Sequence, residues 1–298
     1  MAGPTKGKSA KPSLEDRFEF IGDAVAAGNR AALRSALFEV NDKVTGAERS
    51  LKLWRKTGTS VDDDLRQLWL HEMRQVQRVM SYTGARDVIV DVLEFVEDDD
   101  DFGVVLERVG QPLSERRKRV SRQHWLRNLG GPRPRTLFWR NVRRLVNALG
   151  IIHAQGLVHG RITADVVMTE GADEPDFQLG GFEWSLWLSA DLAGRTHAKI
   201  GPAAAVNRAE SYSFAEDWRA LGILAADCLD SVVKPSGDVQ PSGRGESPIV
   251  LNVSERVLLR RLVAPARMAQ LDADSIGHSI HALIARVARS LSTRAGTV

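Results

Sequence analysis

Glu72 is the residue whose position in the sequence most needs a chemical explanation. It has the same helical spacing as Leu65, Trp69 and Val76 within residues 64–80, so we expect its carboxylate to face inward. A buried carboxylate is costly unless a cation pairs with it. The alternative is that Glu72 lies at the edge of the apolar stripe and reaches water.

Lys52 is the cation that we expect to pair with Glu72. Residues 49–54 alternate in the manner of a strand, which places Leu51 and Leu53 on one face and Lys52 on the other. The sequence therefore predicts an ion pair between a strand and a helix.

The second chemical pattern is a basic stretch, residues 116–144, which holds eleven arginine and lysine residues with Trp125 and Trp139 between them. Cations that neutralise phosphates and aromatic rings that stack on bases are typical of nucleic-acid surfaces. The alternative is a solvated connection that leads into an amphipathic helix, whose outer face carries the last three arginines. That alternative explains about half of the cluster.

The elements that must position these side chains change in character along the chain. Short apolar or alternating runs typical of strands come first, at residues 18–21, 33–40, 49–54, 88–95 and 103–109. The helix 64–80 interrupts them. Helical patterns follow, at residues 138–152, 217–229 and 276–291. This order predicts an α+β protein with a small, mainly β part and a larger helical part.

Composition excludes several classes of protein. The chain has 298 residues, 43% of them hydrophobic and 27% charged, which is typical of a globular protein with a substantial core. No apolar run approaches the roughly 20 residues that span a bilayer. Cys228 is the single cysteine, so a disulfide framework is excluded. The net charge of +3 is too small to indicate nucleic acid by itself. We expect a cytoplasmic bacterial protein that does not bind membranes.

The order of motifs from residue 18 to residue 289 resembles the protein kinase-like fold. Residues 145–168, LVNALGIIHAQGLVHGRITADVVM, are similar to a kinase helix that leads into a catalytic loop of the form H-G-D-I-K-P-E-N-V. Residues 179–183, LGGFE, are similar to the metal-binding L-x-D-F-G motif, and residues 217–222, DWRALG, to the D-x-W-x-L-G start of a later helix. The resemblance implies a bilobal α+β fold, with an antiparallel β N-lobe that has one helix and a mainly helical C-lobe.

The predicted boundaries combine this resemblance with composition. We expect a disordered basic tail at residues 1–13 and an N-lobe at residues 14–109. The C-lobe should span residues 110–290 and contain a flexible loop at 234–248, and a tail or linker should follow at 291–298.

The resemblance is weaker in the N-lobe. Of the glycine-rich loop pattern G-x-G-x-x-G-x-V, residues 26–33 keep only Gly28 and the final apolar position. Lys52 matches the lysine of the third strand, and Glu72 matches the glutamate that pairs with it. The resemblance implies that a bound nucleotide would contact Gly28, Lys52, Glu72 and Glu107, the last of these at the end of the strand before the hinge.

A second metal-binding triplet, Asp101-Phe102-Gly103, is interpreted as coincidence. It precedes the catalytic-loop match and opens a strand, and the acidic run 97–101 before it is interpreted as a solvated turn.

The residues that would perform phosphoryl transfer are replaced. Such transfer needs a carboxylate near the acceptor hydroxyl and magnesium ligands against the phosphates. The family's catalytic aspartate, its lysine, its metal-binding asparagine and aspartate, and the glycine of the metal-binding motif are here Arg161, Thr163, Val166, Gly181 and Glu183. The resemblance therefore implies a pseudokinase without metal or phosphotransfer, with weak, magnesium-independent ATP binding or none. We expect a regulatory or scaffolding module with a protein partner.

Three further residues receive structural roles from the resemblance. His159 should pack beneath the catalytic loop, Phe182 should pack against the helix that carries Glu72, and Asp217 should accept hydrogen bonds from backbone amides of the catalytic loop. Residues 184–216 correspond to the activation segment and lack a clear A-P-E motif.

Two other functions remain open. One is an atypical phosphotransferase or nucleotidyl transferase that uses Asp165 or Glu183 in place of the missing acids. The other is a nucleic-acid-binding module on a kinase-like scaffold, with the basic stretch as its surface.

Overall fold

The computed structural model describes residues 13–29, 33–187, 213–234, 236–243, 249–264 and 271–295, with the side chains of residues 187 and 287–295 excepted. The chain divides into two compact units. Unit 1 comprises residues up to Leu70 together with Asp91–Arg108, and unit 2 comprises His71–Val90 together with residues from Val109 onward. Helix α2, Val61–Met80, contributes to both units. The predicted lobe boundary at residue 110 stays a prediction.

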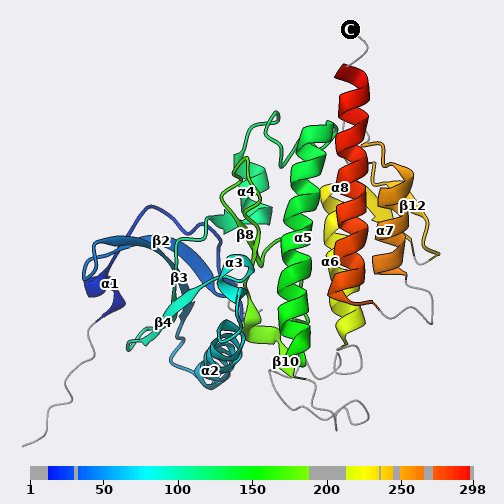
Figure 1. The fold of residues 1–298 in the computed structure, drawn as a ribbon. Helices are drawn as coiled ribbons and strands as arrows, with labels where there is room; N and C mark the ends of the chain where they lie inside the picture. The colour runs from blue at the N-terminus through cyan, green and yellow to red at the C-terminus, as the bar shows by residue number, and fades with distance from the viewer. Residues whose placement is uncertain are drawn as a thin grey trace, which may run out of the picture. The chain divides into compact units, whose positions relative to one another are not determined.

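Unit 1 contains a five-stranded antiparallel sheet (Figure 1). Its strands are β1 Phe18–Phe20, β2 Ala36–Asp42, β3 Ala47–Arg55, β4 Val92–Glu97 and β5 Asp101–Leu106. Their order in the sheet is β1-β2-β3-β5-β4. With the helices below, this sheet confirms the α+β class.

The core of unit 1 covers one face of this sheet. Helix α1, Leu14–Arg17, begins at Ser13, whose side chain and backbone form a capping box with Asp16. Leu14 then joins a cluster of buried apolar side chains, namely Phe18, Val40, Leu51, Leu53, Val96 and Val105. Gly103 is required here because a Cβ at that position would lie 2.7 Å from a methyl group of Val96.

The acidic run before β5 forms a turn in which Asp99 and Asp100 are exposed, but the predicted solvation is wrong for its other two aspartates. Asp98 and Asp101 are both buried. The Asp98 carboxylate accepts hydrogen bonds from the backbone N–H groups of Leu14 at 2.8 Å and Asp101 at 2.7 Å. Asp101 pairs with Arg55. These carboxylates are buried because they satisfy backbone donors and a cation.

The run 88–95 is also different from the predicted strand. Helix α3, Ala85–Val88, ends there, and β4 begins only at Val92. Gly84, with φ of +82°, starts the short helix, and Ile89 forms an isolated bridge with Leu179. The apolar residues are therefore shared between two elements, one in each unit.

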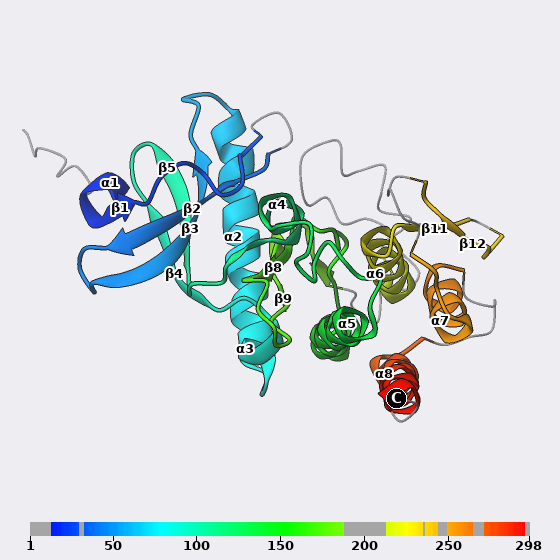
Figure 2. The ribbon, with the colours of Figure 1, turned by 90° about the horizontal axis from the view of Figure 1, so that it is seen from above.

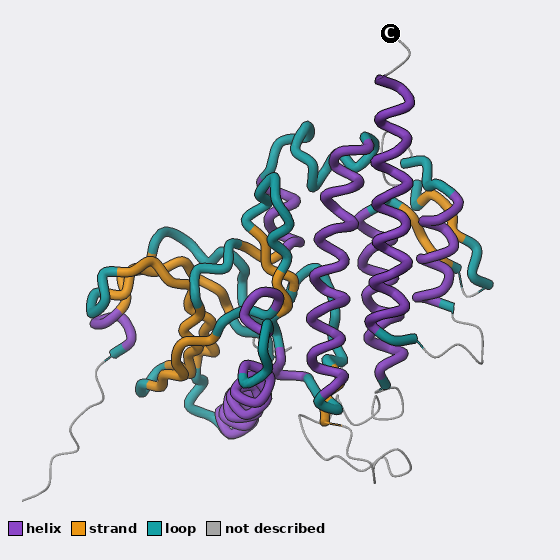
Figure 3. The backbone as a smooth tube through the Cα atoms, viewed as in Figure 1, coloured by secondary structure: helices purple, strands orange, loops and turns teal. Residues whose placement is uncertain are grey.

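Unit 2 is built mainly from helices (Figures 2 and 3). Besides part of α2 and α3, they are α4 Leu113–Arg119, α5 Pro132–Ala154, α6 Phe214–Cys228, α7 Val253–Val263 and α8 Ala273–Ala295. Helices α5, α6 and α8 run alongside one another. The last of these extends through residues 291–295, so the predicted final tail begins as helix.

Short strand pairs connect these helices. The sheet β6-β8-β9 contains Gln111–Pro112, Val167–Thr169 and Gln178–Leu179, and β7 Leu157–Val158 pairs with β10 Leu186–Trp187. A 3₁₀ turn, Phe182–Trp184, separates β9 from β10.

The predicted flexible loop 234–248 is in part a hairpin, which corrects that prediction. Strand β12, Val239–Pro241, pairs with β11, Ser231–Val233. Gly237 has φ of +86° and allows the chain to reverse between them. The composition of the segment indicated the turn but not the strand.

The predicted helical stripes are largely confirmed. Every apolar residue of the α5 stripe is buried: Phe138, Val142, Leu145, Leu149 and Ile152. In α8, Ile276, Ile280 and Leu283 are buried, while the side chains of Val287 and Leu291 lie outside the described residues. Helix α6 is less enclosed than predicted, because Ile223 is 49% exposed.

Candidate functional site

The first turn of α6 is joined to the loop after β7 by Asp217. This carboxylate is 1% exposed and accepts hydrogen bonds from the backbone N–H groups of His159 and Gly160, both at 2.8 Å. His153 Nε2, on α5, lies 2.9 Å from the same carboxylate. We call Asp217, His153, His159 and Gly160 the Asp217 anchor. It contains the backbone contacts that the sequence predicts for Asp217.

His159 is fully buried within this anchor. Its Nδ1 accepts the backbone N–H of Arg161 at 3.3 Å, so Nε2 carries the proton and donates to the Gly180 carbonyl at 2.9 Å. Burial lowers the pKa of His159, against the opposing influence of Asp217 and the Gly180 carbonyl. The imidazole is therefore held neutral, as a spacer between two backbone segments.

Phe182 lies beside this histidine. It is 2% exposed, and its ring is edge-on to His159 with centroids 5.2 Å apart. Its packing against the helix that carries Glu72 stays a prediction.

Val166, just before β8, contacts Gly181, just after β9. Gly181 has φ of +77°, and a Cβ at its position would lie 2.5 Å from Val166 Cγ1. We call this the Val166–Gly181 contact. These are the positions that the resemblance matches to two magnesium ligands, and neither side chain offers an oxygen. A valine methyl group fills the space beside the glycine.

The neighbouring charged residues belong to the 3₁₀ turn and its surroundings. Burial lowers the pKa of both His71 and His159, and the buried Glu183 carboxylate opposes part of that shift. His71 Nε2, on α2, lies 2.6 Å from the Ser185 carbonyl. The Arg161 guanidinium lies 5.6 Å from the ring centre of Trp184. Arg161 thus places a cation at the position that the resemblance matches to a catalytic base.

Thr163 and Asp165 lie on the exposed side of the same loop. Ser114 Oγ donates to Asp165 Oδ1 at 2.7 Å, and the Ala164 carbonyl accepts from the Ser114 backbone at 3.1 Å. The Thr163 hydroxyl is 3.4 Å from the Asp165 backbone N–H. Asp165 therefore ties the loop to the first turn of α4.

Lys52 and Glu72 are both buried, with 9% and 3% exposed. The alternative in which Glu72 reaches water is therefore wrong. The Lys52 ammonium lies 4.5 Å from the ring centre of Trp54, which shares its face of β3. Lys52 belongs to unit 1 and Glu72 to unit 2, so their ion pair stays a prediction.

Gly28 lies where the chain folds back on the start of β2. A Cβ on Gly28 would lie 2.9 Å from the backbone nitrogen of Ala36, so only glycine fits. Asn29 and Arg34 exchange backbone hydrogen bonds across this turn, while residues 30–32 between them lie outside the described residues. Most of the predicted activation segment, residues 188–212, also lies outside them.

Glu107 forms an exposed ion pair with Arg49 at 2.8 Å. Its backbone N–H donates to the Asp91 carbonyl at 2.9 Å. The carboxylate is therefore already occupied by a neighbouring strand.

The two tryptophans of the basic stretch 116–144 lie inside unit 2, while most of its arginine and lysine side chains are exposed. Trp125 and Trp139 are buried, and their indole N–H groups donate to backbone carbonyls and to Glu255 respectively. Arg144 donates to the Phe177 and Asp87 carbonyls rather than only lining an outer helix face. The rings that would stack on bases are therefore not at the surface.

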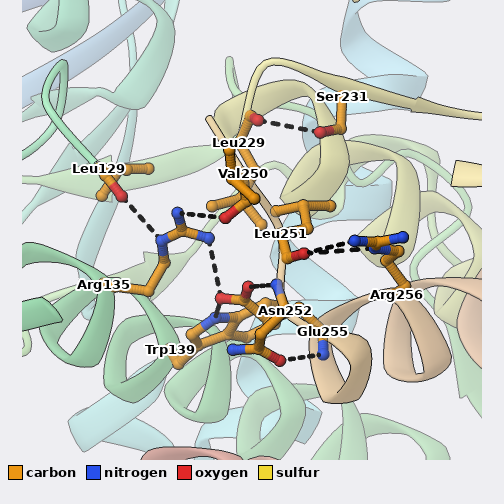
Figure 4. A network of polar contacts seen from close by, with 10 residues as sticks. All are labelled: Leu129, Arg135, Trp139, Leu229, Ser231, Val250, Leu251, Asn252, Glu255 and Arg256. Carbon is orange, nitrogen blue, oxygen red and sulfur yellow. Dashed lines mark hydrogen bonds and ion pairs between the residues drawn. The ribbon is translucent and has the colours of Figure 1, made fainter. Parts of the chain in front are cut away.

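Figure 4 shows a buried network that the sequence did not predict. Arg135, on α5, donates to Glu255, on α7, at 2.9 Å, and Trp139 donates to the same oxygen at 2.9 Å. Asn252 and Glu255 form a capping box at the start of α7. The N-x-x-E spacing before an apolar helix was the signal available in the sequence.

Glu255 is 1% exposed, so its charge depends on these donors. The network holds α7 against α5 and is structural.

The comparisons leave the family open. No family model matches the sequence, and no curated protein matches it. Among the described residues, no three His, Cys, Asp or Glu side chains are grouped as metal ligands. No helix in the described part of the chain is both long and apolar enough to cross a membrane.

Proposed function

We propose that the chain is a degenerate member of the protein kinase-like superfamily, a pseudokinase that regulates or scaffolds a protein partner without transferring phosphate. Unit 1 corresponds to the small lobe in this proposal, and unit 2 to the large lobe. The observation that carries it is the Val166–Gly181 contact, where two apolar residues occupy both positions that the resemblance matches to metal ligands.

The Asp217 anchor supports the proposal because it keeps contacts that the resemblance implies. Asp217, His159 and Gly160 make the framework contacts that the resemblance implies for a catalytic loop, with both backbone bonds at 2.8 Å. This loop keeps its supporting contacts but has arginine, not an acid, at position 161. It is therefore suited to a structural role rather than to activating a hydroxyl group.

Nucleotide binding in this proposal is weak and independent of magnesium, or absent. An ammonium with 9% exposure can still meet a phosphate oxygen, but a bound triphosphate would find no metal ligand at positions 166 and 181. Arg161 adds a cation to the same loop, which would repel an incoming metal ion.

The test is incubation of the full chain with ATP labelled at the γ- or the α-phosphate, with magnesium or manganese. We expect no label on the chain or on an added acceptor protein. Label from either position would overturn the proposal if it disappears in Lys52→Ala and persists in Lys43→Ala. Lys43 is a matched control because its ammonium binds the backbone carbonyls of the exposed residues Glu15 and Asp16.

The same assay separates the enzyme alternative by the position of the label. Transfer of γ-label would indicate a phosphotransferase, and transfer of α-label a nucleotidyl transferase. Loss of that transfer in Glu183→Gln or Asp165→Asn would identify the recruited acid.

A further inference from the structure

A pocket of about 450 Å³ opens on the sheet of unit 1. Ala36 on β2 and Leu53 on β3 are direct neighbours in the sheet register and lie on its floor. Phe38, two residues along β2, continues the same face. The pocket lies on the side of the sheet that carries the unit 1 core, and no residue of the proposed kinase-like site except Gly28 lines it.

Two phenylalanines form the apolar part of this pocket. Phe20, at the end of β1, and Phe38 are half-buried, and their rings meet edge-on with centroids 5.0 Å apart. Faces of aromatic rings that the chain does not cover favour a flat or branched apolar group. The volume is in the range of pockets that bind small molecules, roughly 300–1,000 Å³.

Arginines supply the polar part. Arg55 Nε and Nη2 each lie 3.4 Å from an oxygen of Asp101, longer than a strong hydrogen bond between ions. The Arg55 side chain is 58% exposed, and these contacts leave the two N–H groups of Nη1 for another acceptor. Arg34 also lines the pocket and is its second arginine.

The pocket has fewer acceptors to offer. Asp101 is buried, and both of its oxygens face Arg55. Glu15, the other acid, lies on the exposed helix α1. A ligand that brings acceptors to the arginines is therefore favoured over one that brings donors.

We propose that this pocket binds a small carboxylic acid that carries an aromatic or branched apolar group. The apolar group would lie on Phe20 and Phe38, and the carboxylate would bind Arg55 and Arg34. An apolar residue at the C-terminus of a peptide has the same chemistry. The proposal uses only the geometry of unit 1 and does not depend on the proposed pseudokinase function.

The probes are N-acetylphenylalanine, its neutral amide, and the tripeptide Ala-Ala-Phe. In 15N–1H NMR spectra of the full chain, titration with the acid should give saturable shifts of the backbone amide signals of Phe20, Phe38 and Arg55. The amide should bind at least about tenfold more weakly, because it cannot make a charge-assisted bond. A free acid that binds more tightly than the tripeptide identifies a small acid as the source, and the reverse order identifies a peptide C-terminus.

Two variants test the pocket by different means. Arg55→Met keeps most of the side-chain length and removes the guanidinium, and Ala36→Leu fills the floor; each should weaken binding of the acid about tenfold or more. Arg49→Met is the matched control, since Arg49 lies on the same strand but outside the pocket, and it should leave binding unchanged.

Removing the cation beside buried Asp101 should lower the unfolding temperature of Arg55→Met, so a folded NMR spectrum of this variant at the titration temperature establishes that lost binding is not lost folding. The proposal is wrong if the acid gives no saturable shift up to its solubility limit. It is also wrong if acid and amide bind equally, or if both pocket variants bind as the parent does.

Discussion

The Asp217 anchor and the Val166–Gly181 contact both belong to unit 2, yet they differ in chemistry. At the anchor, a carboxylate with 1% exposure meets backbone N–H groups at 2.8 Å. At the contact, a glycine with φ of +77° meets a valine methyl group. The first is polar and well satisfied, and the second is apolar and closed. The difference teaches that one compact unit can combine a carboxylate whose acceptors are satisfied by backbone donors with a closed apolar contact.

The largest expected effect comes from removing the carboxylate of the anchor. Asp217→Ala should lower the free energy of unfolding by about 3–5 kcal/mol, because it leaves buried donors of His159, Gly160 and His153 without an acceptor. Urea denaturation measures it. Glu216→Ala is the neighbouring control, and since its side chain is 44% exposed it should cost within about 1 kcal/mol. Equal losses in the two variants would show that the anchor contributes nothing special.

The next largest effect is expected from placing a side chain at Gly181, in the Val166–Gly181 contact. Gly181→Asp should lower the free energy of unfolding by about 2–3 kcal/mol, since a Cβ there meets Val166 and the backbone has a positive φ. Combining it with Val166→Ala should recover part of that loss, beyond what the two single variants predict by addition.

An additive cycle would mean that the two residues do not contact each other. Gain of magnesium-dependent phosphotransfer in Gly181→Asp would show that the loop had lost only one acid.

A smaller effect concerns pH. Burial lowers the pKa of His159 and of His71 below the ordinary value of 6.5. The unfolded chain therefore binds more protons than the folded chain as pH falls below 6.5, so stability decreases on acidification from there. Each histidine contributes a slope of up to about 1.4 kcal/mol per pH unit.

Urea denaturation between pH 7 and pH 5 measures this slope, and His71→Gln should reduce it. A slope unchanged by that substitution would mean that the His71 imidazole titrates alike in both states.

The smallest effect is expected at the position matched to the hinge. Glu107→Gln should change the free energy of unfolding by only about 0.5 kcal/mol or less, because the Glu107 side chain is 49% exposed in its pair with Arg49. The same denaturation assay checks it. A loss comparable with that of Asp217→Ala would mean that this end of β5 is a second anchor.

Much of the fold could be predicted because apolar periodicity reports buried faces. The stripe from Phe138 to Ile152 is buried at every predicted position, and Glu72 at its helical spacing is buried as well. The contacts of Asp217 followed from motif order, since the local pattern alone does not reveal which amides an acid will meet.

The remaining features depend on pairings between distant residues. In the sequence, Glu255 is one more acid on an amphipathic helix. In the structure, Arg135 and Trp139 on α5 both donate hydrogen bonds to it. The burial of Asp98 depends in the same way on the N–H of Leu14, 84 residues away. Strand β12 needs its partner β11, and its composition alone resembles that of a loop. Polar residues whose partners are remote in sequence give no periodic signal.

The central claim is that unit 2 keeps the framework of a catalytic loop without a magnesium site. Thermal unfolding of the full chain with ATP, in the presence and absence of magnesium, tests it most directly. The account predicts a small shift in unfolding temperature or none, and the same value with and without the metal. A large stabilisation that appears only when ATP and magnesium are both present, and that is lost in Lys52→Ala, would contradict it.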